Sequence, residues 1–273
     1  MPSTVETESG LDPRTFRRIA EIVYQKAGIV LGEKKEALVA ARLGKRMRQL
    51  GLTRYSEYLT LLENSPEEGE PIEMLNAIST NVTQFFREPA HFKRMADWLM
   101  QWHAAGQTRF RMWCAAASSG EEPYCMAMMV REHLPPELDV RILATDLSTR
   151  ALAEAKAGLY SGTDISPIPQ PLRDRYFKPA QGGVYRVSDE LTTLIKFARL
   201  NLSHPPFPMQ GPFDVIFCRN VMIYFDNDVR RRLLEECHRL LRVDGYLVVG
   251  HAESLSGLLG AFKPLEPSIY IKK

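Results

Sequence analysis

The stretch 113–124 (WCAAASSGEEPY) combines small side chains with two adjacent carboxylates directly after an apolar run. Small residues allow a backbone to approach a ligand closely, and Pro123 is well placed to open a helix. At the positive start of that helix, Glu121 and Glu122 would repel the diphosphate of a dinucleotide, but they suit the ammonium and sulfonium charges of S-adenosylmethionine. Stabilisation of the helix start by acidic side chains explains the same residues equally well.

Two further apolar runs end in polar side chains. One run (ILATD) ends in Asp146, and another, 213–218, leads into Arg219 and Asn220. Ligands of an open parallel sheet bind beyond the carboxyl ends of its strands, so these side chains are candidates for a binding site. Asp146 could hold the ribose hydroxyls of an adenosine cofactor or cap the next helix, for which Ser148 is the better placed cap.

The elements around these residues alternate between strands and helices. A helix capped by Asp226 and closed by Gly245 precedes a strand at 246–249. The alternation predicts right-handed βαβ units and an α/β fold with a doubly wound parallel sheet. Gly182-Gly183 before 184–187 predicts a short inserted β-hairpin. Strands are also predicted at 109–116, 140–145, 194–200 and 213–218, and helices at 89–103, 121–134 and 150–157.

The first part of the chain, 11–62, has apolar residues at helical spacing, which predicts a small helical bundle. Gly28 and Gly51 stand where two of these helices should stop. The stretch 66–71 (PEEGEP) is polar and rich in helix breakers, so a connection is predicted there, near the end of a first domain.

Length and composition favour two unequal globular domains. The chain has 273 residues, of which 45% are apolar and 25% charged, and a net charge of only +2. The N-terminus lacks a signal peptide and no apolar run is long enough to cross a bilayer, which predicts a cytoplasmic protein without membrane insertion. The four cysteines form no Cys-x-x-Cys pair, so buried thiols are expected rather than zinc ligands or disulfides.

Three segments together resemble a known family. Asn81–Glu88 (NVTQFFRE), 115–124 and 217–225 resemble, in order, the motifs of the chemotaxis protein methyltransferases, the CheR-type receptor glutamate methyltransferases. The likeness runs from about Leu11 to Tyr270. It implies a Rossmann-like S-adenosylmethionine methyltransferase domain, a small N-terminal helical domain and an inserted antiparallel β-subdomain. The implied bounds are 1–75 for a receptor-docking domain, 76–90 for a linker contributing to the cofactor site, and 91–273 for the catalytic domain with its insertion at about 160–192.

The resemblance also implies roles for individual residues. S-adenosyl-L-methionine would be the methyl donor and S-adenosyl-L-homocysteine the product, with no metal. Arg87 and Tyr224 match residues near the transferred methyl group and are the predicted catalytic pair. The implied cofactor-binding residues are Asn81, Thr83, Arg87, Glu122, Asp146, Asn201, Leu202, Arg219 and Asn220.

The chemistry of such a reaction is consistent with these residue types. A glutamate carboxylate, with a pKa of about 4.3, is ionised near neutral pH and can attack a sulfonium methyl without a general base. Arg87 could hold that carboxylate in a bidentate grip. The structural alternatives are a salt bridge from Arg87 to Glu88 or to a domain interface, and ordinary core packing of Tyr224.

The segment 34–54 holds seven basic residues and one acidic residue. On its predicted helix, the polar residues fall on one side and the apolar residues on another. This face would be attracted to an acidic helical partner such as the cytoplasmic bundle of a methyl-accepting chemotaxis receptor, although simple solvation is the usual meaning of such a face. The predicted docking residues are Lys35, Arg42, Lys45 and Arg46.

Other functions and partners remain to be weighed against this one. The basic face could contact RNA, and 204–207 (HPPF) is similar to the NPPF signature of amino methyltransferases. That signature follows the fourth strand and begins with asparagine, so 204–207 is interpreted as a loop and no nucleic-acid partner is expected. A third possibility is a cofactor-binding module without catalysis, but the presence of Arg87 and Tyr224 argues against it.

The sequence departs from the family pattern at two places. Cys125 stands where the family usually has serine, and the predicted hairpin turn, 178–184, is short. The short turn predicts no tight binding of a receptor C-terminal pentapeptide.

Overall fold

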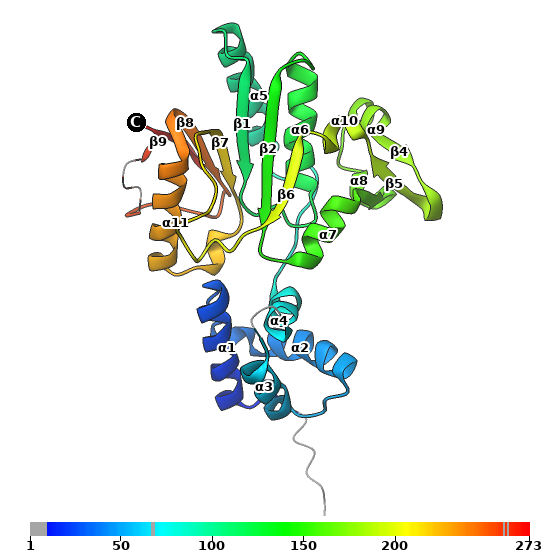
Figure 1. Ribbon diagram of the computed structural model, residues 1–273, viewed down its shortest axis with the longest axis vertical. Coiled ribbons are helices and arrows are strands. Elements are labelled where there is room, and N and C mark those ends of the chain that lie inside the picture. The colour runs from blue at the N-terminus through cyan, green and yellow to red at the C-terminus, as the bar shows by residue number, and fades with distance from the viewer. Residues whose placement is uncertain (1–9, 67–68, 259, 261) are drawn as a thin grey trace, which may run out of the picture. The chain divides into compact units, whose positions relative to one another are not determined.

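The computed structural model describes residues 10–66, 69–258, 260 and 262–273. The chain divides into two compact units, Met1–Thr80 and Asn81–Lys273 (Figure 1). No helix among the described residues is both long and apolar enough to cross a membrane.

The N-terminal unit consists of helices, as the spacing of its apolar residues predicts. The Asp12 carboxylate caps the first helix by accepting the amides of Arg14 and Thr15 at 2.9 and 3.0 Å. Gly28 and Gly51 end two helices in the left-handed conformation, with φ of 67° and 71°, which confirms both predicted stops. The elements are α1 (Pro13–Ala27), η1 (Glu33–Lys35), α2 (Glu36–Leu50), α3 (Tyr55–Asn64) and α4 (Glu70–Ile78).

Helix α4 begins inside the stretch 66–71, so the prediction of a connection is wrong for the end of that stretch. Glu70 is its first residue and is buried, and Pro71 follows in the first turn. Proline fits there because the first amides of a helix have no intrahelical partner. The breaker residues therefore mark the start of a helix rather than a continuing loop.

The C-terminal unit contains a seven-stranded sheet in the order β6-β2-β1-β7-β8-β10-β9. Five neighbouring strands are parallel, which confirms the predicted doubly wound sheet, and β10 pairs antiparallel with β8 and β9, which was not predicted. The strands are β1 (Arg109–Cys114), β2 (Asp139–Asp146), β6 (Ile195–Arg199), β7 (Phe213–Cys218), β8 (Leu241–Val249), β9 (Phe262–Glu266) and β10 (Ile269–Lys272).

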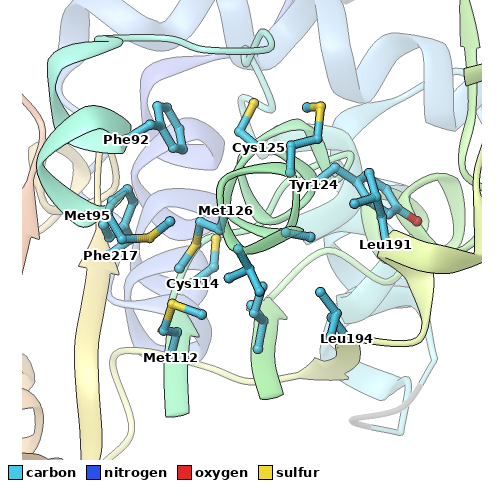
Figure 2. Packing of buried hydrophobic residues seen from close by; sticks show 14 of the residues in the cluster. Phe92, Met95, Met112, Cys114, Tyr124, Cys125, Met126, Leu191, Leu194 and Phe217 are labelled. Atoms are coloured by element: carbon cyan, nitrogen blue, oxygen red, sulfur yellow. The ribbon is translucent and has the colours of Figure 1, made fainter. Parts of the chain in front are cut away.

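Helices cover both faces of this sheet, with α5 behind it and α11 in front in Figure 1. Figure 2 shows the core around α6, where Met126 lies among Cys114 of β1, Phe92 and Met95 of α5 and Phe217 of β7. Close packing of these side chains makes the sheet and helices a rigid platform for the loops at the strand ends. The helices are α5 (Ala90–Ala104), α6 (Glu121–His133), α7 (Thr149–Ala157) and α11 (Asn227–Leu240).

The insertion forms a second, three-stranded antiparallel sheet in the order β3-β5-β4. The predicted hairpin is present, and Gly182 and Gly183 turn it with positive φ. Phe85 contacts this subdomain, with ring centroids 4.9 Å from Tyr160 and 5.5 Å from Phe177. The elements are β3 (Leu159–Ser161), α8 (Gly162–Ile165), α9 (Gln170–Tyr176), β4 (Phe177–Pro179), η2 (Gln181–Gly183), β5 (Val184–Val187) and α10 (Asp189–Thr192).

One predicted helix end is wrong. Asp226 caps α11 as expected, but the helix stops at Leu240 and Gly245 lies within β8. A Cβ on Gly245 would come within 2.9 Å of the Asp214 carbonyl oxygen, so a close approach of β8 to β7 requires this glycine. Sequence spacing cannot distinguish that strand glycine from a helix stop.

Candidate active site at the carboxyl edge of the sheet

The order of the strands reverses between β1 and β7, which lie side by side although β2 follows β1 and β8 follows β7 in the chain. In doubly wound sheets, the crevice at this reversal is where ligands bind. The loops that leave β1 and β7 here carry two of the three predicted motifs.

Arg219, the first residue after β7, is at the centre of a buried charge cluster. Its side chain has no exposed surface, and its guanidinium lies 2.6 Å from Glu122 Oε2 and 3.1 Å from Glu88 Oε2. It also donates to the Arg87 carbonyl oxygen at 2.6 Å, and lies over the ring of Phe92. Burial alone would lower the pKa of Arg219, but the two carboxylates raise it, so the arginine is firmly charged.

This cluster joins all three predicted motifs. The pKa of Glu88 is held below its usual value because the attraction of Arg219 outweighs the effect of burial. Glu122 accepts a further hydrogen bond, at Oε1, from the Cys114 thiol at 3.2 Å. Two carboxylates share the single charge of Arg219, so the three side chains together keep a net negative charge, which is consistent with a cationic ligand nearby.

The backbone around the cluster is strained. Six non-glycine residues among those described have positive φ, and four of them lie in the motif segments: Phe86 and Glu88 at 55°, Ser118 at 49° and Asn220 at 58°. Each such conformation costs on the order of 1 kcal/mol or more and persists only where its surroundings enforce it. Their concentration here is typical of a functional site.

The turn after β1 contacts the end of β2 through backbone groups. Asp146 accepts the amide of Ser118 at 2.8 Å and that of Ser148 at 2.9 Å, and the Ser118 hydroxyl is buried without a partner among the described residues. Ser148 caps α7, as predicted, by accepting the Ala151 amide. Gly120 has φ of 102°, and a Cβ there would meet the Tyr160 hydroxyl at 2.8 Å.

The end of β6 lies beside the end of β2, since Arg199 is in register with Asp146. Asn201 and Leu202 lie just beyond Leu200, and Asn201 Oδ1 accepts the Ser203 amide at 3.1 Å. The segment 204–207 is a loop, as expected. A carboxylate, an amide and a buried leucine thus meet at one edge, a set of groups that fits the ribose and adenine of an adenosine cofactor.

Comparison with known sequences agrees with this geometry. The profile of "CheR methyltransferase, SAM binding domain" matches residues 81–271, and that of "CheR methyltransferase, all-alpha domain" matches residues 14–79. The chain belongs to the CheR family of methyltransferases. The resemblance noted from the motifs is confirmed, and the enzyme is an S-adenosylmethionine-dependent methyltransferase.

Similar proteins cover most of the chain. The "Chemotaxis protein methyltransferase" of Escherichia coli (strain K12) is 40% identical over 260 residues, which are 93% of this chain and 89% of the relative. The "Chemotaxis protein methyltransferase 2" of Pseudomonas aeruginosa is 41% identical over 246 residues, 88% of this chain and 86% of the relative. That of Borreliella burgdorferi is 38% identical over 248 residues, 88% of both chains.

The two predicted catalytic residues of this methyltransferase lie on different segments. Arg87 is half-buried, and among the described residues its guanidinium has one hydrogen bond, from Nη1 to the Val82 carbonyl oxygen at 3.1 Å. The alternative of an Arg87–Glu88 salt bridge is wrong, because Glu88 pairs with Arg219. Tyr224 is half-buried in the short turn η3 (Met222–Tyr224). Asn81 and Thr83, at the start of the same unit, are half-buried too.

Glu121 does not contribute to the charge cluster. It is buried and accepts the Ser119 hydroxyl at 2.8 Å, and burial raises the pKa of its carboxyl. The two adjacent glutamates at the helix start therefore have different partners: Glu122 pairs with Arg219, and Glu121 binds the Ser119 hydroxyl.

Three potential metal ligands, Glu88, His91 and His251, lie within 4.8 Å of one another. His91 is buried, and burial together with the charge of Arg219 lowers its pKa to about 4. Glu88 Oε2, the oxygen that faces both imidazoles, already accepts from Arg219, whose positive charge opposes a cation at this place. The cluster is better described as a neutral, buried His91 beside the ion pair of Glu88 and Arg219.

The predicted docking residues of α2 have different environments. Arg42 donates to the Ile78 carbonyl oxygen and to the Thr80 hydroxyl at the end of α4. Arg46 grips the buried Glu70 with Nε–Oε1 and Nη2–Oε2 distances of 3.0 and 2.6 Å. Both therefore join α2 to α4. Lys45 is exposed and Lys35 half-buried.

All four cysteines are buried and free, as predicted. Cys125 Sγ accepts the Phe86 amide at 3.1 Å, so this thiol supports the strained Asn81–Glu88 segment. Sequence reasoning missed one buried polar residue at the site, Glu253. The only signal for Glu253 in the sequence was the presence of an acidic residue soon after the apolar run 246–249.

Proposed function

We propose that this methyltransferase transfers the methyl group of S-adenosyl-L-methionine to glutamate side chains of a methyl-accepting chemotaxis receptor. The products would be glutamate methyl esters and S-adenosyl-L-homocysteine. The observation that carries the proposal is the contrast between two arginines: Arg219 is buried and neutralised, whereas Arg87 has one backbone hydrogen bond among the described residues. The planar fork of Arg87 is therefore available for a substrate carboxylate.

The reaction requires little acid–base chemistry from the protein. The donor supplies an electrophilic methyl group on a sulfonium. The ionised glutamate oxygen forms the new C–O bond while the methyl–sulfur bond breaks, and the bonding electrons stay on sulfur. Arg87 orients the carboxylate, and Tyr224 lies beside the transferred methyl group, so catalysis consists of positioning and electrostatics.

We further propose that the cofactor lies along the carboxyl edge of the sheet. Asp146 would bind the ribose, with Asn201 and Leu202 beside the adenine, and the partnerless Ser118 hydroxyl is suited to a ligand in the same crevice. Asn81, Thr83, Arg87, Glu122, Arg219 and Asn220 would complete the pocket around the amino-acid and sulfonium groups, without a metal.

The acceptor would dock on the helical unit through α2. The exposed residues Leu38, Lys45 and Arg48 of α2 are spaced by seven and three residues, which places them on one stripe of the helix, and the exposed Lys34 lies in the preceding η1. Positive charge around an apolar centre suits an acidic receptor helix, and we expect a protein rather than nucleic acid as partner. Of the four docking residues predicted from the sequence, Lys45 is the one most accessible to an acceptor, because Arg42 and Arg46 bind groups of the helical unit itself. A cytoplasmic location follows from a receptor's cytoplasmic bundle as substrate.

The turn between β4 and β5 is relevant to a second possible contact with the receptor, through its C-terminal pentapeptide. It consists of Ala180 and the three residues of η2, of which Gly182 and Gly183 have exposed, side-chain-free backbone. We infer that so short a turn does not hold a receptor C-terminal pentapeptide tightly. Calorimetry with such a peptide should give no micromolar affinity.

The decisive experiment incubates the protein with methyl-labelled S-adenosylmethionine and bacterial membranes containing a chemoreceptor. The product is then treated with mild alkali. Carboxyl esters release volatile labelled methanol, whereas label that resists alkali would indicate N-methylation and refute the proposal. Membranes whose receptor carries glutamine at the methylation positions provide the matched control and should remain unlabelled.

A further inference from the structure

Glu253 lies in the loop that follows β8 and is 3% exposed. Its carboxylate accepts three backbone amides at 2.7 Å: those of Gly250 and Asn220 at Oε2, and that of Met222 at Oε1. Burial raises the pKa of Glu253, and the backbone hydrogen bonds oppose that shift. Three amide donors satisfy this carboxylate, and no cation pairs with it among the described residues.

The three amides belong to two different loops. Gly250 follows β8, whereas Asn220 and Met222 belong to the loop after β7, so Glu253 connects the ends of two neighbouring strands. The loops are in close contact, because a Cβ on Gly250 would lie 2.3 Å from Asn220 Nδ2. Asn220 also has a left-handed backbone, which requires such support.

The supported loop carries residues of the site. Asn220 Nδ2 donates to Glu88 Oε1 at 3.4 Å, and Arg219, the preceding residue, centres the charge cluster. Met222 begins η3, whose last residue is Tyr224. The hydrogen bonds to the amides of Asn220 and Met222 therefore fix the backbone immediately before Tyr224.

We propose that Glu253 is a positioning residue of the methyltransferase, whose carboxylate holds the 220–224 segment in the geometry that presents Asn220 and Tyr224 to the reactants. The inference rests on the proposed roles of Asn220 and Tyr224. Glu253 itself acts from behind the loop through backbone amides, so its effect reaches the reaction only through the loop.

The test variant is Glu253→Gln, which keeps the volume but replaces one accepting oxygen with an NH2 group that opposes a backbone N–H. The control is Glu236→Gln, since Glu236 on α11 is also buried and accepts a backbone amide, that of Phe207 at 2.8 Å, together with the guanidinium of Arg239, and neither partner belongs to the 219–225 segment. Two quantities are measured: hydrogen exchange of peptide 219–225, and kcat per site that binds S-adenosylhomocysteine by calorimetry.

We expect Glu253→Gln to increase exchange in 219–225 and to lower kcat per binding site by roughly tenfold or more, while the control changes neither. A purely structural role would reduce the number of binding sites or the melting temperature but leave kcat per site intact, and this result would overturn the proposal. Unchanged exchange in 219–225 would overturn it as well.

Failure of the proposed function is seen separately. It would appear in the wild-type protein as the absence of alkali-labile label, whatever the variants do. Exchange and S-adenosylhomocysteine affinity would still report whether Glu253 orders the loop.

Discussion

Each compact unit contains an arginine paired with glutamate: Arg46 pairs with the buried Glu70, and Arg219 pairs with the half-buried Glu88 and Glu122. Arg46 in the helical unit binds Glu70, which also accepts the Tyr58 hydroxyl at 2.8 Å, and both partners stand on regular helices. Arg219 in the catalytic unit binds Glu88 and Glu122. Positive φ at three nearby non-glycine residues accompanies the second cluster, whereas the described residues around the first show none.

The difference separates structural ion pairs from functional ones. Helix packing accounts for the Arg46 cluster, because its hydrogen bonds join α2, α3 and α4. Packing does not account for strained backbone at Phe86, Glu88 and Asn220, which a purely structural pair would not require. Burial of charge alone is thus a poor indicator of a site, and burial of charge together with enforced strain is a better one.

The largest effect is expected for Arg219→Met. It removes a fully buried guanidinium and leaves the half-buried Glu88 and Glu122 without a cation, which should destabilise the catalytic unit by about 3 kcal/mol. All three tryptophans, Trp98, Trp102 and Trp113, are in this unit, so urea unfolding followed by tryptophan fluorescence reports on it. Arg141→Met, at a side chain that is 72% exposed, should change stability by less than about 0.5 kcal/mol. Equal effects of the two variants would contradict a tightly coupled cluster.

Arg87→Lys tests the functional arginine without removing its charge. Because lysine lacks the planar fork, we expect kcat for receptor methylation to fall roughly a hundredfold, equivalent to about 2.7 kcal/mol of transition-state stabilisation, with unchanged urea stability. Alkali-labile label on receptor membranes provides the assay. A kcat within threefold of the wild type would mean that a point charge suffices and that the fork has no catalytic role.

Arg46→Met should affect only the helical unit. Its ion pair is partly exposed, with 23% of the arginine side chain accessible, so a loss of about 2 kcal/mol is expected. Hydrogen exchange should increase in α2 and α4, while the tryptophan-monitored transition stays unchanged. Adding Glu70→Gln should recover part of the loss, because the unpaired carboxylate is then removed. No such recovery would show that Arg46 stabilises by packing alone.

The same contrast explains what the sequence could predict. Strands and helices with clear periodicity, such as β7 and α6, were predicted to within a residue, because local spacing determines burial. The motifs located Arg219 and Asn220 at a strand end. Spacing could not predict that Glu122 and Glu88 converge on Arg219, or that Arg46 turns inward to Glu70, because these contacts depend on tertiary packing between distant segments. Glu253 was missed for the same reason: its partners are backbone amides, which carry no residue signature.

Glu88→Gln gives a smaller, pH-dependent effect. The pKa of Glu88 is lowered in the folded protein, so its ionised form contributes stability above its unfolded pKa of about 4.3, and this contribution is lost as pH falls through the folded value. The stability of the wild type should therefore decrease more steeply between about pH 5 and pH 3 than that of Glu88→Gln. Tryptophan-monitored unfolding across this range is the measurement. Parallel curves would mean that Arg219 does not favour ionised Glu88.

The smallest effect is expected for Lys45→Ala, which sharpens the comparison within α2. Lys45 is exposed one residue before the inward-facing Arg46, so its loss should leave stability unchanged and raise the KM for receptor membranes about two- to threefold at low salt. The difference should vanish at roughly 0.5 M salt, because screening weakens interactions between exposed charges. Lys156→Ala, at an exposed lysine of α7, should leave KM unchanged at every salt concentration. If Lys45→Ala behaves like Lys156→Ala, the basic stripe of α2 is only a solvated face, and acceptor docking must involve another surface.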